Sequence, residues 1–302
     1  MYGTKKRKEI KLSLLEVGIP VYNGEKYIKE CIDSVLNQTF EDLEIYVYDN
    51  ASTDGTGHIL NGYIGVEKVH LIRKKENEGP LANWNDCITS SDAKYVSLLC
   101  ADDAWKPNHA EMMVRGLEEH SNCVLAYSPC DWIDENSNLI GTLHHPGHKT
   151  EEVWGGRDEL GELLVYDDYI TISSAVFRND AVKKVGKFDV VSSADWQYFL
   201  RFGNMFDDFY FNPNPTCLYR KHEEQDSTSF YNSDAPLITH CSMLLDFLQY
   251  GNKEKLKGYS QRIWSYFINR CNMYPQSAYG LQFFTSKIGQ YLQELDRSLL
   301  ED

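Results

Sequence analysis

The feature that most constrains the fold is a regular alternation of strand-like and helix-like segments over the first part of the chain. Short apolar runs typical of buried strands are separated by stretches whose apolar residues recur at helical spacing. Such an alternation predicts a mostly parallel sheet with helices on both faces. The expected strands are Leu12–Ile19, Leu43–Tyr48, Lys68–Ile72, Tyr95–Leu99 and Val124–Tyr127, and the expected helices begin near Gly24, Asp54, Pro80 and Pro107.

The remainder of the chain is less regular and ends in helical patterns. From about Ser233 onward, apolar residues recur only at helical spacing. This pattern indicates a packed helical subdomain, and a surface that faces a partner or a membrane is the alternative. We therefore predict two domains, residues 1–232 and residues 233–302. The elements expected before this boundary are a strand over Ile172–Phe177, a helix over Ala194–Phe202, and two strands within Phe209–Tyr219.

Composition disfavours several classes of protein. The 302 residues carry 30 basic and 45 acidic side chains, a net charge of −15, which disfavours a nucleic-acid partner and broad docking on anionic lipid. The eight cysteines show no C-x-x-C pair and no zinc spacing, so we interpret them as buried thiols in a reducing compartment. We see no signal segment and no apolar run near the ~18 residues of a membrane span. These features predict a cytoplasmic protein, and peripheral contact with the cytoplasmic face of a membrane stays open.

Polar side chains cluster where three of the predicted strands end. The clusters are Tyr22-Asn23, Asp49-Asn50 and Asp102-Asp103. Ordinary turn chemistry explains any one of them, but ligands of parallel sheets bind beyond the carboxyl ends of strands, so three clusters at one edge favour a shared site. The adjacent carboxylates of Asp102 and Asp103 repel each other, and a hard divalent cation would relieve that repulsion. The glycine-rich dinucleotide and phosphate loops are absent, as are zinc-protease and serine-hydrolase motifs.

Six ordered blocks of the sequence, over about residues 12–230, carry a family resemblance. They are Val17–Ile28 with Ser34–Phe40, Tyr48–Thr56, Asn77–Gly79 with Asn83, Leu98–Pro107, Ala194-Asp195 with Leu200-Arg201, and Tyr219–His222 followed by Gln225 and Ser227. Together these blocks resemble family 2 glycosyltransferases. The resemblance implies a GT-A fold of class α/β, in which helices flank a Rossmann-like, mostly parallel central sheet. It also implies an inverting enzyme that moves a sugar from a nucleoside diphosphate to an acceptor hydroxyl.

The resemblance implies a nucleotide pocket at the strand ends. Tyr22 would lie against the nucleobase, and Asp49 would accept a hydrogen bond from a ring N–H, which suits uracil or thymine. UDP is the expected nucleotide, and dTDP and GDP are the alternatives. Residues 77–83 would shape the floor and the ribose side of the pocket, with turn and helix-cap roles as the alternative. The residues that match this pocket are Pro20, Tyr22, Asn23, Asp49, Asn77, Gly79, Asn83 and Asp102, with Glu25 as a weaker candidate.

The resemblance also implies a metal centre for Mn²⁺ or Mg²⁺. Many members carry Asp-x-Asp-Asp where this chain has Cys100-Ala101-Asp102-Asp103, so the first aspartate is replaced. We expect Asp103 to bind the metal, Asp102 to lie nearer the ribose, and His222 to complete the site; a loop histidine bonded to a neighbour is the alternative. A thiolate ligand from Cys100 is disfavoured because these hard cations prefer oxygen.

The matched helix carries the expected catalytic base. Asp195 would remove the proton of the attacking hydroxyl as the new bond forms. The family often has Glu-Asp where this chain has Ala194-Asp195. Trp196 is a weak candidate for the acceptor site, where its ring would face a sugar, and core packing is the alternative. A Q-x-x-R-W signature of processive members is absent, which favours transfer of single sugars.

Other functions stay open at this point. The replacements at Cys100 and Ala194 suggest a catalytically degenerate relative that only binds nucleotide sugars. A nucleotidyltransferase would be expected to show a basic, glycine-rich loop after the first strand, and this chain lacks one. The favoured interpretation is a transferase in bacterial-type polysaccharide or glycoconjugate synthesis, with a glycan, glycolipid or glycoprotein acceptor.

Overall fold

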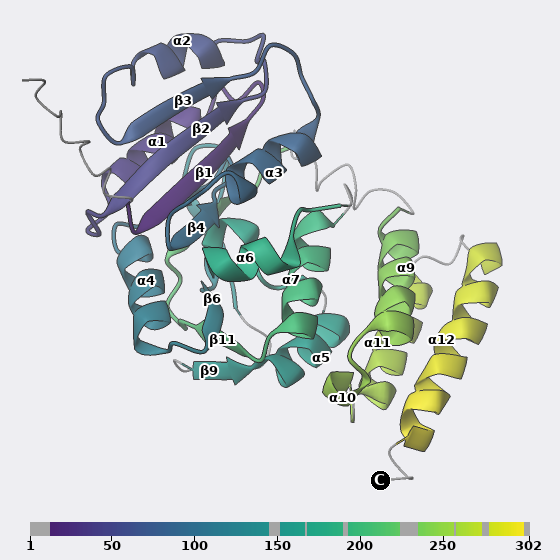
Figure 1. The fold of residues 1–302 in the computed structure, drawn as a ribbon. Coiled ribbons are helices and arrows are strands. Elements are labelled where there is room, and N and C mark those ends of the chain that lie inside the picture. Colours follow the sequence, from purple (N-terminus) through teal and green to yellow (C-terminus); the bar gives the residue numbers. More distant parts are fainter. Residues whose placement is uncertain are drawn as a thin grey trace, which may run out of the picture.

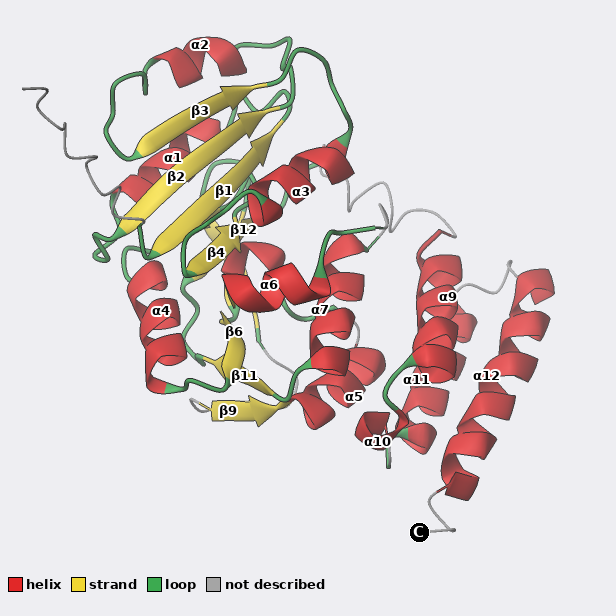
Figure 2. Cartoon of the chain, viewed as in Figure 1, coloured by secondary structure: helices red, strands yellow, loops and turns green. Residues whose placement is uncertain are grey.

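The computed structural model describes residues 13–144, 152–166, 168–189, 193–223, 235–256, 258–273 and 278–298. Figures 1 and 2 show a mixed α/β molecule with a row of helices along one side. The strands are β1 (Leu15–Val21), β2 (Leu43–Asp49), β3 (Val69–Arg73), β4 (Tyr95–Leu98), β5 (Ala104–Trp105), β6 (Cys123–Tyr127), β7 (Cys130–Ile133), β8 (Leu139–Leu143), β9 (Glu152–Gly155), β10 (Val176–Arg178), β11 (Asp208–Phe211) and β12 (Cys217–Arg220).

The helices include one short 3₁₀ turn, Ile172–Ser174. The α-helices of the first 190 residues are α1 (Ile28–Leu36), α2 (Thr56–Asn61), α3 (Pro80–Thr89), α4 (His109–Glu119), α5 (Gly156–Tyr166) and α6 (Asn179–Val185). Those that follow are α7 (Ala194–Met205), α9 (Ala235–Tyr250), α10 (Lys253–Leu256), α11 (Ser260–Met273) and α12 (Ala278–Ser298).

The described strands form two sheets. The larger has the order β3-β2-β1-β4-β10-β6-β11-β9, and the smaller has the order β5-β12-β7-β8. β1 pairs in parallel with β2 and β4, and β2 pairs in parallel with β3. The predicted α/β fold with a mostly parallel central sheet is therefore confirmed. β10 is antiparallel to both of its neighbours, β4 and β6.

Close packing of a helix on β1 explains a glycine in the middle of that strand. α3 crosses this face of the sheet, as Figure 1 shows. A Cβ atom at Gly18 would lie 2.6 Å from the Cβ atom of Cys87 on α3, well inside contact distance. The flanking Val17 and Ile19 are fully buried. The absence of a side chain at this position of the strand therefore allows α3 to approach it closely.

The middle of the chain departs from the predicted elements. Residues 172–177, predicted as one strand, are a 3₁₀ turn followed by β10. The Ser174 hydroxyl donates to the carbonyl of Thr171, and the Ser173 hydroxyl binds the side chain of Asp103, so both serines hold the chain in a turn. The two strands predicted within residues 209–219 are confirmed as β11 and β12, but they belong to different sheets.

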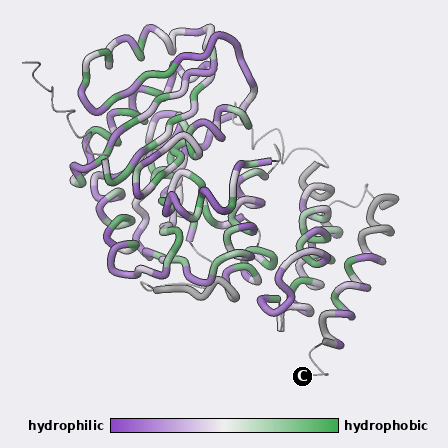
Figure 3. Tube along the Cα trace, viewed as in Figure 1, coloured by the Kyte–Doolittle hydropathy of each residue, from purple (hydrophilic) through white to green (hydrophobic). Residues whose placement is uncertain are grey.

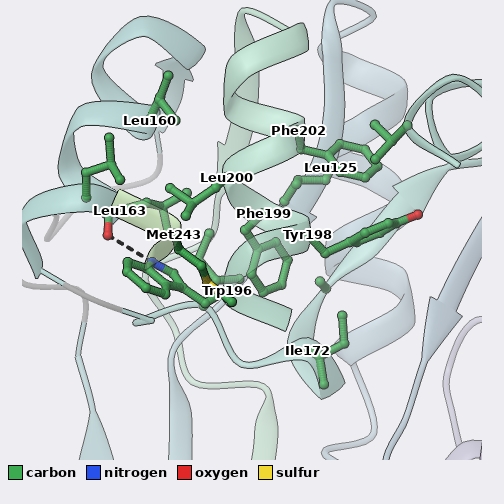
Figure 4. Close-up of a cluster of buried hydrophobic side chains, with 14 of the residues drawn as sticks. Leu125, Leu160, Leu163, Ile172, Trp196, Tyr198, Phe199, Leu200, Phe202 and Met243 are labelled. Atoms are coloured by element: carbon green, nitrogen blue, oxygen red, sulfur yellow. Dashed lines mark hydrogen bonds between the residues drawn. The ribbon is translucent and has the colours of Figure 1, made fainter. Parts of the chain in front are cut away.

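The C-terminal helical patterns are confirmed as α9 to α12. α9 packs on α12, and α10 and α11 pack on α5, so these helices stand side by side in Figure 1. Met243 of α9 joins Trp196 and Leu160 in one buried cluster, which Figure 4 shows. The domain boundary predicted at 232/233 lies outside the described residues. The shared core nevertheless ties these helices closely to α5 and α7.

Side-chain polarity follows this architecture. Figure 3 shows apolar stretches along the interior strands and helices and polar stretches in many connecting loops. Six of the eight cysteines are buried, and none is in a disulfide bond. Among the described residues, no helix is both long enough and apolar enough to span a bilayer.

Candidate active site

The structure brings the three polar clusters to one edge of the large sheet. β1, β2 and β4 run parallel, so their carboxyl ends lie together. Val21 is the register partner of Asp49, and the backbone N–H of Asn50 donates to the Val21 carbonyl at 2.8 Å. Asp102 and Asp103 follow the end of β4. The convergence predicted from the strand ends is therefore observed.

The predicted base pocket combines an exposed ring with a buried carboxylate. The side chain of Tyr22 is 48% exposed, whereas Pro20 is buried in β1 and Asp49 is only 2% exposed. The Asp49 Oδ1 atom accepts the backbone N–H of Ser52 at 2.9 Å. Its Oδ2 atom lies 3.2 Å from the Nε atom of Arg73, whose side chain is 60% exposed. Arg73 can therefore move aside for a ligand that binds Asp49.

Asn23 and Glu25 tie the loop after β1 to the loop after β2. Asn23 has a left-handed backbone with φ of 53°, and its Oδ1 atom accepts the Thr53 N–H at 2.8 Å. The Glu25 carboxylate accepts the Gly55 N–H at 2.5 Å. In this structure both side chains fix the loops around the pocket.

The third of the matched blocks, Asn77–Gly79 with Asn83, supports the pocket through hydrogen bonds to the backbone and to Asn50. The Nδ2 atom of Asn50 donates to the Oδ1 atom of Asn77 at 2.9 Å and to the Gly79 carbonyl at 3.1 Å. Gly79 has a φ of 86° and precedes α3. Asn83 is 3% exposed and donates to the carbonyl of Tyr48 at 2.9 Å. These contacts match the turn and cap alternative, and a ribose contact stays a prediction.

The two aspartates after β4 have different surroundings. Asp103 is 1% exposed, and its carboxylate accepts the Ser173 hydroxyl at 2.5 Å and the Arg220 backbone N–H at 2.9 Å. Burial, with the nearby charge of Asp102, raises the pKa of Asp103 well above its usual range. The Asp102 side chain is 30% exposed and turns toward His222. Burial also raises the pKa of the Cys100 thiol well above its usual range, which disfavours a thiolate.

His222 and Asp102 place an imidazole nitrogen and a carboxylate oxygen next to each other at this edge. The His222 Nε2 atom lies 3.1 Å from the Asp102 Oδ2 atom. Two neighbouring ligands of an octahedral Mg²⁺ lie about 3 Å apart, so one small divalent cation fits between these atoms. The ligand atoms of Cys100, Asp102 and Asp103 lie within 4.8 Å of one another. The donor chemistry therefore fits the predicted cation. Gln225 and Ser227 of the same motif lie outside the described residues.

Arg220 holds in place the loop that carries Asp102 and Asp103, called the acidic loop below. Its guanidinium, 1% exposed, donates to the carbonyls of Asp102 at 2.7 Å and Asp134 at 3.0 Å. It also binds the Glu30 carboxylate at 2.6 Å and lies over the ring of Tyr27, 4.5 Å from the ring centroid. One side chain thus joins the acidic loop, α1 and the loop after β7.

We expect Arg220→Lys to lower the free energy of unfolding by about 2–4 kcal/mol. An ammonium group cannot reach the carbonyls of Asp102 and Asp134 together, and each unsatisfied buried acceptor costs about 1–3 kcal/mol. Urea denaturation measures the change. The matched control is Arg115→Lys, at a side chain that is 46% exposed, where a change within about 0.5 kcal/mol is expected. Equal stability of the two variants would contradict this role for Arg220.

Asp195 and Trp196 start α7 but face different environments. Asp195 is partly exposed, and its Oδ1 atom accepts the Trp196 N–H at 3.0 Å. Burial raises the pKa of Asp195, and its hydrogen bonds oppose that rise. Trp196 is fully buried and donates its Nε1–H to the Leu163 carbonyl at 2.9 Å (Figure 4). This placement is the packing alternative, so an acceptor contact for Trp196 has no support in the structure.

Sequence reasoning missed Arg73 and Ser173, and it gave Arg220 no role of its own. In the structure Arg73 pairs with Asp49, and Ser173 and Arg220 bind Asp103. Arg73 follows the strand expected over Lys68–Ile72, and Ser173 lies within the strand expected over Ile172–Phe177, so no local pattern singles out either residue. Arg220 belongs to the sixth block, Tyr219–His222, and that resemblance is the signal that includes it.

These strand-end clusters form a polar site at the carboxyl edge of a parallel sheet, which is where such sheets bind their ligands. The sequence profile described as Glycosyl transferase family 2 matches residues 16–186, more than half of the chain. The chain belongs to this family.

Curated relatives include transferases and polysaccharide synthases. The chain is 27% identical over 198 residues to an uncharacterized glycosyltransferase of Methanocaldococcus jannaschii, covering 64% of this chain and 66% of the relative. It is 33% identical over 156 residues to the putative teichuronic acid biosynthesis glycosyltransferase TuaG of Bacillus subtilis, covering 51% and 56%. It is 28% identical over 185 residues to the chondroitin synthase of Escherichia coli, covering 54% and 27%. The chain therefore spans between about a quarter and two thirds of these relatives' lengths.

Solved structures share the fold at low sequence identity. TarS 1–349 of S. aureus in complex with UDP-GlcNAc aligns with a TM-score of 0.69 and 18% identity, covering 86% of this chain and 73% of that one. The mannosyltransferase PcManGT of Pyrobaculum calidifontis, in complex with GDP-Man and Mn²⁺, aligns with a TM-score of 0.57 and 14% identity, covering 96% and 88%. These similarities support the GT-A fold.

Proposed function

We propose that the chain is an inverting glycosyltransferase that moves a single sugar from a UDP-sugar to an acceptor hydroxyl. The observation that carries the proposal is the placement of Tyr22, Asp49, Asp102 and His222 at one sheet edge, in a chain of this family. A UDP-GlcNAc complex of TarS supports the choice of a uridine nucleotide. Relatives that are polysaccharide synthases support a glycan or glycoconjugate acceptor.

Asp49 and Tyr22 bind the nucleobase in the proposed enzyme. The exposed Tyr22 ring offers an apolar face, and the Asp49 carboxylate accepts the ring N–H of uracil once Arg73 moves aside. A pyrimidine with one ring N–H matches a single buried carboxylate, because an unpaired buried acceptor is costly. Asn77 and Gly79 hold the rim through Asn50.

Asp102 and His222 hold the divalent cation in the proposed enzyme. The cation, Mn²⁺ or Mg²⁺, would offset the negative charge that the diphosphate leaving group develops. Asp103 is 1% exposed and its oxygens accept hydrogen bonds from Ser173 and Arg220, so we assign it to support of the loop and the more exposed Asp102 to the metal. This revises the expected order of the two aspartates. PcManGT, whose complex contains Mn²⁺, supports the choice of ion.

Asp195 acts as the general base. It accepts the proton of the acceptor hydroxyl while that oxygen attacks the anomeric carbon and the nucleoside diphosphate departs. A carboxylate at the start of a helix can do this only if it is reachable, and Asp195 is partly exposed. A single displacement of this kind inverts the anomeric carbon. The predicted cytoplasmic location would give such an enzyme access to nucleotide sugars.

A binding panel tests the donor assignment. A ligand that binds only the folded state stabilises it, so each nucleotide that binds should raise the melting temperature of the chain. We expect UDP with Mn²⁺ to raise it more than GDP or dTDP do, because UDP is the proposed nucleotide. We expect Asp49→Asn to weaken UDP binding about 10- to 100-fold, since a charge-assisted hydrogen bond contributes about 1.5–3 kcal/mol. Isothermal titration calorimetry measures the affinity.

The matched control for Asp49→Asn is Asp208→Asn. Asp208 begins β11, which runs parallel to β6, and it therefore lies at the opposite edge of the sheet. The UDP affinity of Asp208→Asn should stay within twofold of wild type. Wild-type affinity in Asp49→Asn would remove Asp49 from the site, and no binding of any nucleotide by the wild-type chain would contradict the proposed function.

A further inference from the structure

One face of the small sheet carries two aromatic rings and a lysine. Trp132 of β7 and Tyr219 of β12 are register partners in parallel strands, so their side chains stand next to each other on the same face. Lys221 comes directly after β12, and its backbone N–H donates to the Ile133 carbonyl at 2.8 Å, so the pairing continues through it. The Lys221 Nζ atom lies 4.8 Å from the centroid of the Trp132 ring and 4.5 Å from that of Tyr219. These three residues are called the aromatic–lysine cluster below.

The aromatic–lysine cluster and the proposed metal site use opposite faces of β12. Side chains alternate along a strand, so Tyr219 and Lys221 share one face. Arg220 lies on the other face, where its guanidinium donates to the Asp102 carbonyl at 2.7 Å. His222 is on the same side as Arg220, since its Nε2 atom lies 3.1 Å from the Asp102 Oδ2 atom. The cluster is therefore next to the metal site along the chain but points to the other side of the sheet.

The face that carries the cluster is turned toward α7. Trp105 of β5 is the register partner of Cys217, two residues before the tyrosine of the cluster, so it lies on this same face. The Trp105 indole N–H donates to the carbonyl of Ser173 in the 3₁₀ turn at 2.7 Å. Ile172 of that turn lies in one buried cluster with Trp196 of α7, as Figure 4 shows. The face therefore belongs to the side of the site on which α7 begins with the candidate base.

Lys221 is an exposed cation, and no described carboxylate pairs with it. Lys74, Lys94 and Lys106, in contrast, each form an ion pair with a carboxylate. The two rings attract the Lys221 ammonium by cation–π interaction, worth about 0.5–1 kcal/mol at exposed sites, but they do not neutralise its charge. The cluster therefore presents one positive charge beside two ring surfaces.

The ring surfaces of the cluster are only partly covered. Trp132 and Tyr219 are half-buried. Gly141 of β8 is the register partner of Trp132, and a Cβ atom there would lie 3.2 Å from the Trp132 Cε3 atom, so the ring lies close over the backbone of β8. The negative face of such a ring attracts the C–H groups of a sugar. The cluster thus offers one contact for a sugar ring and another for an anion.

We propose that the aromatic–lysine cluster binds the acceptor through a uronic acid, whose ring packs on the aromatic side chains and whose carboxylate pairs with Lys221. The inference rests on the proposed function, because it takes the bound sugar to be part of the acceptor. One ammonium matches the single charge of a carboxylate, whereas a phosphate monoester carries about −1.5 to −2 and calls for more donors. The net charge of −15 gives no general attraction for an acidic glycan, so its selection requires a local cation.

Two probes that differ only at C6 test the role of the charge. Methyl β-glucuronide carries a carboxylate there, and methyl β-glucoside carries a neutral hydroxymethyl group. We expect the wild-type chain to bind the glucuronide about 10-fold more tightly, because a charge-assisted hydrogen bond contributes about 1.5–3 kcal/mol. Saturation-transfer NMR measures both affinities, and the preference should shrink as salt screens the exposed charge.

Variants of Lys221 assign the preference to this side chain. Lys221→Met keeps an apolar stem without the charge and should remove the preference, whereas Lys221→Arg keeps the charge and should retain it. The matched control is Lys184→Met, because the Lys184 Nζ atom also lies over a ring, 5.9 Å from the centroid of Phe206. Phe206 follows the far end of α7 from Asp195, so the control should bind both probes as wild type does.

Variants of Trp132 test the ring surface. Trp132→Ala should weaken the binding of both probes by a similar factor of about 3- to 10-fold, because an aromatic contact is worth about 0.5–1.5 kcal/mol. Trp132→Phe keeps a ring and should restore most of the affinity. Melting temperatures show whether each variant is folded, and if Trp132→Ala is not, Trp132→Phe and the Lys221 variants still decide the outcome.

Several results would overturn the inference. These are no detectable binding of the glucuronide, equal affinity for the two probes, or a preference that survives Lys221→Met. Tighter binding of methyl β-glucoside 6-phosphate than of the glucuronide would overturn the choice of a carboxylate. Saturating UDP with Mn²⁺ should change the glucuronide affinity by no more than about twofold, as expected of separate sites. Displacement of the glucuronide by UDP would place Lys221 in the donor site and would also overturn the inference.

The failure of this inference and that of the proposed function are distinguishable, because the titrations need no turnover. If the wild-type chain releases UDP from a donor but shows no preference for the glucuronide, only the inference is wrong. If it prefers the glucuronide but releases UDP from no donor, the proposed function is contradicted and the uronic acid site stands.

Discussion

Turnover of Asp195→Asn is expected to fall by about 10²–10⁴-fold, the usual contribution of a general base. The amide keeps the size of the side chain, and its oxygen can still accept the Trp196 N–H, but it takes no proton at neutral pH. Donor binding depends on the strand ends and the acidic loop, so the affinity for UDP should stay near that of wild type. Steady-state release of UDP and calorimetry measure the two quantities.

The control for this variant lies on the loop before α7. Asp189→Asn changes an exposed carboxylate that lies beside Arg201, and it should keep full turnover. Full turnover of Asp195→Asn would refute its role as the base. A fall in UDP affinity equal to the fall in rate would instead mean that Asp195 organises the site.

Asp102→Asn should abolish most of the effect of Mn²⁺ on nucleotide binding. Asp102 and His222 offer a carboxylate oxygen and an imidazole nitrogen 3.1 Å apart, and replacing the carboxylate with an amide removes the charge that binds the cation. Even supporting contacts of metal ligands change metal affinity by about 10–100-fold, so loss of a ligand should cost at least as much. Titration of UDP with and without Mn²⁺ measures the change.

Asp103→Asn is the comparison that assigns the two aspartates. Because Asp103 accepts two hydrogen bonds in the interior, an amide there would place N–H groups against donors and lower the melting temperature. Asp102→Asn should keep the wild-type melting temperature. If Asp103→Asn stays folded and alone loses the Mn²⁺ effect, Asp103 binds the metal, as the sequence predicts, and the proposed assignment to Asp102 is wrong. Turnover that survives EDTA would remove the metal from the proposed mechanism.

Local patterns were enough to predict the half of the fold that carries the nucleotide site. Buried strands such as β1 and β2 are short apolar runs, and their parallel pairing follows from the helices between them. The polar clusters at the strand ends could therefore be placed at one edge of the sheet from the sequence alone. The strand predicted over residues 172–177 was wrong in its first half because two serine hydroxyls hold a turn there.

The surroundings of the site could not be predicted because they depend on distant contacts. Ser173 reaches Asp103 across 70 positions, and Arg220 reaches the Asp102 carbonyl across 118. Those contacts decide which aspartate faces outward, and no pattern near residues 100–103 encodes them.

The most direct test of the proposed transferase is the product of its reaction with water. The wild-type chain is incubated with Mn²⁺ and α-linked UDP-sugars, UDP-GlcNAc first, without another acceptor. We expect release of UDP together with a free sugar whose first-formed anomer, followed by NMR before mutarotation, is β. A first-formed α anomer would contradict the single displacement assisted by Asp195. Absence of UDP release from every donor would contradict the proposed activity itself.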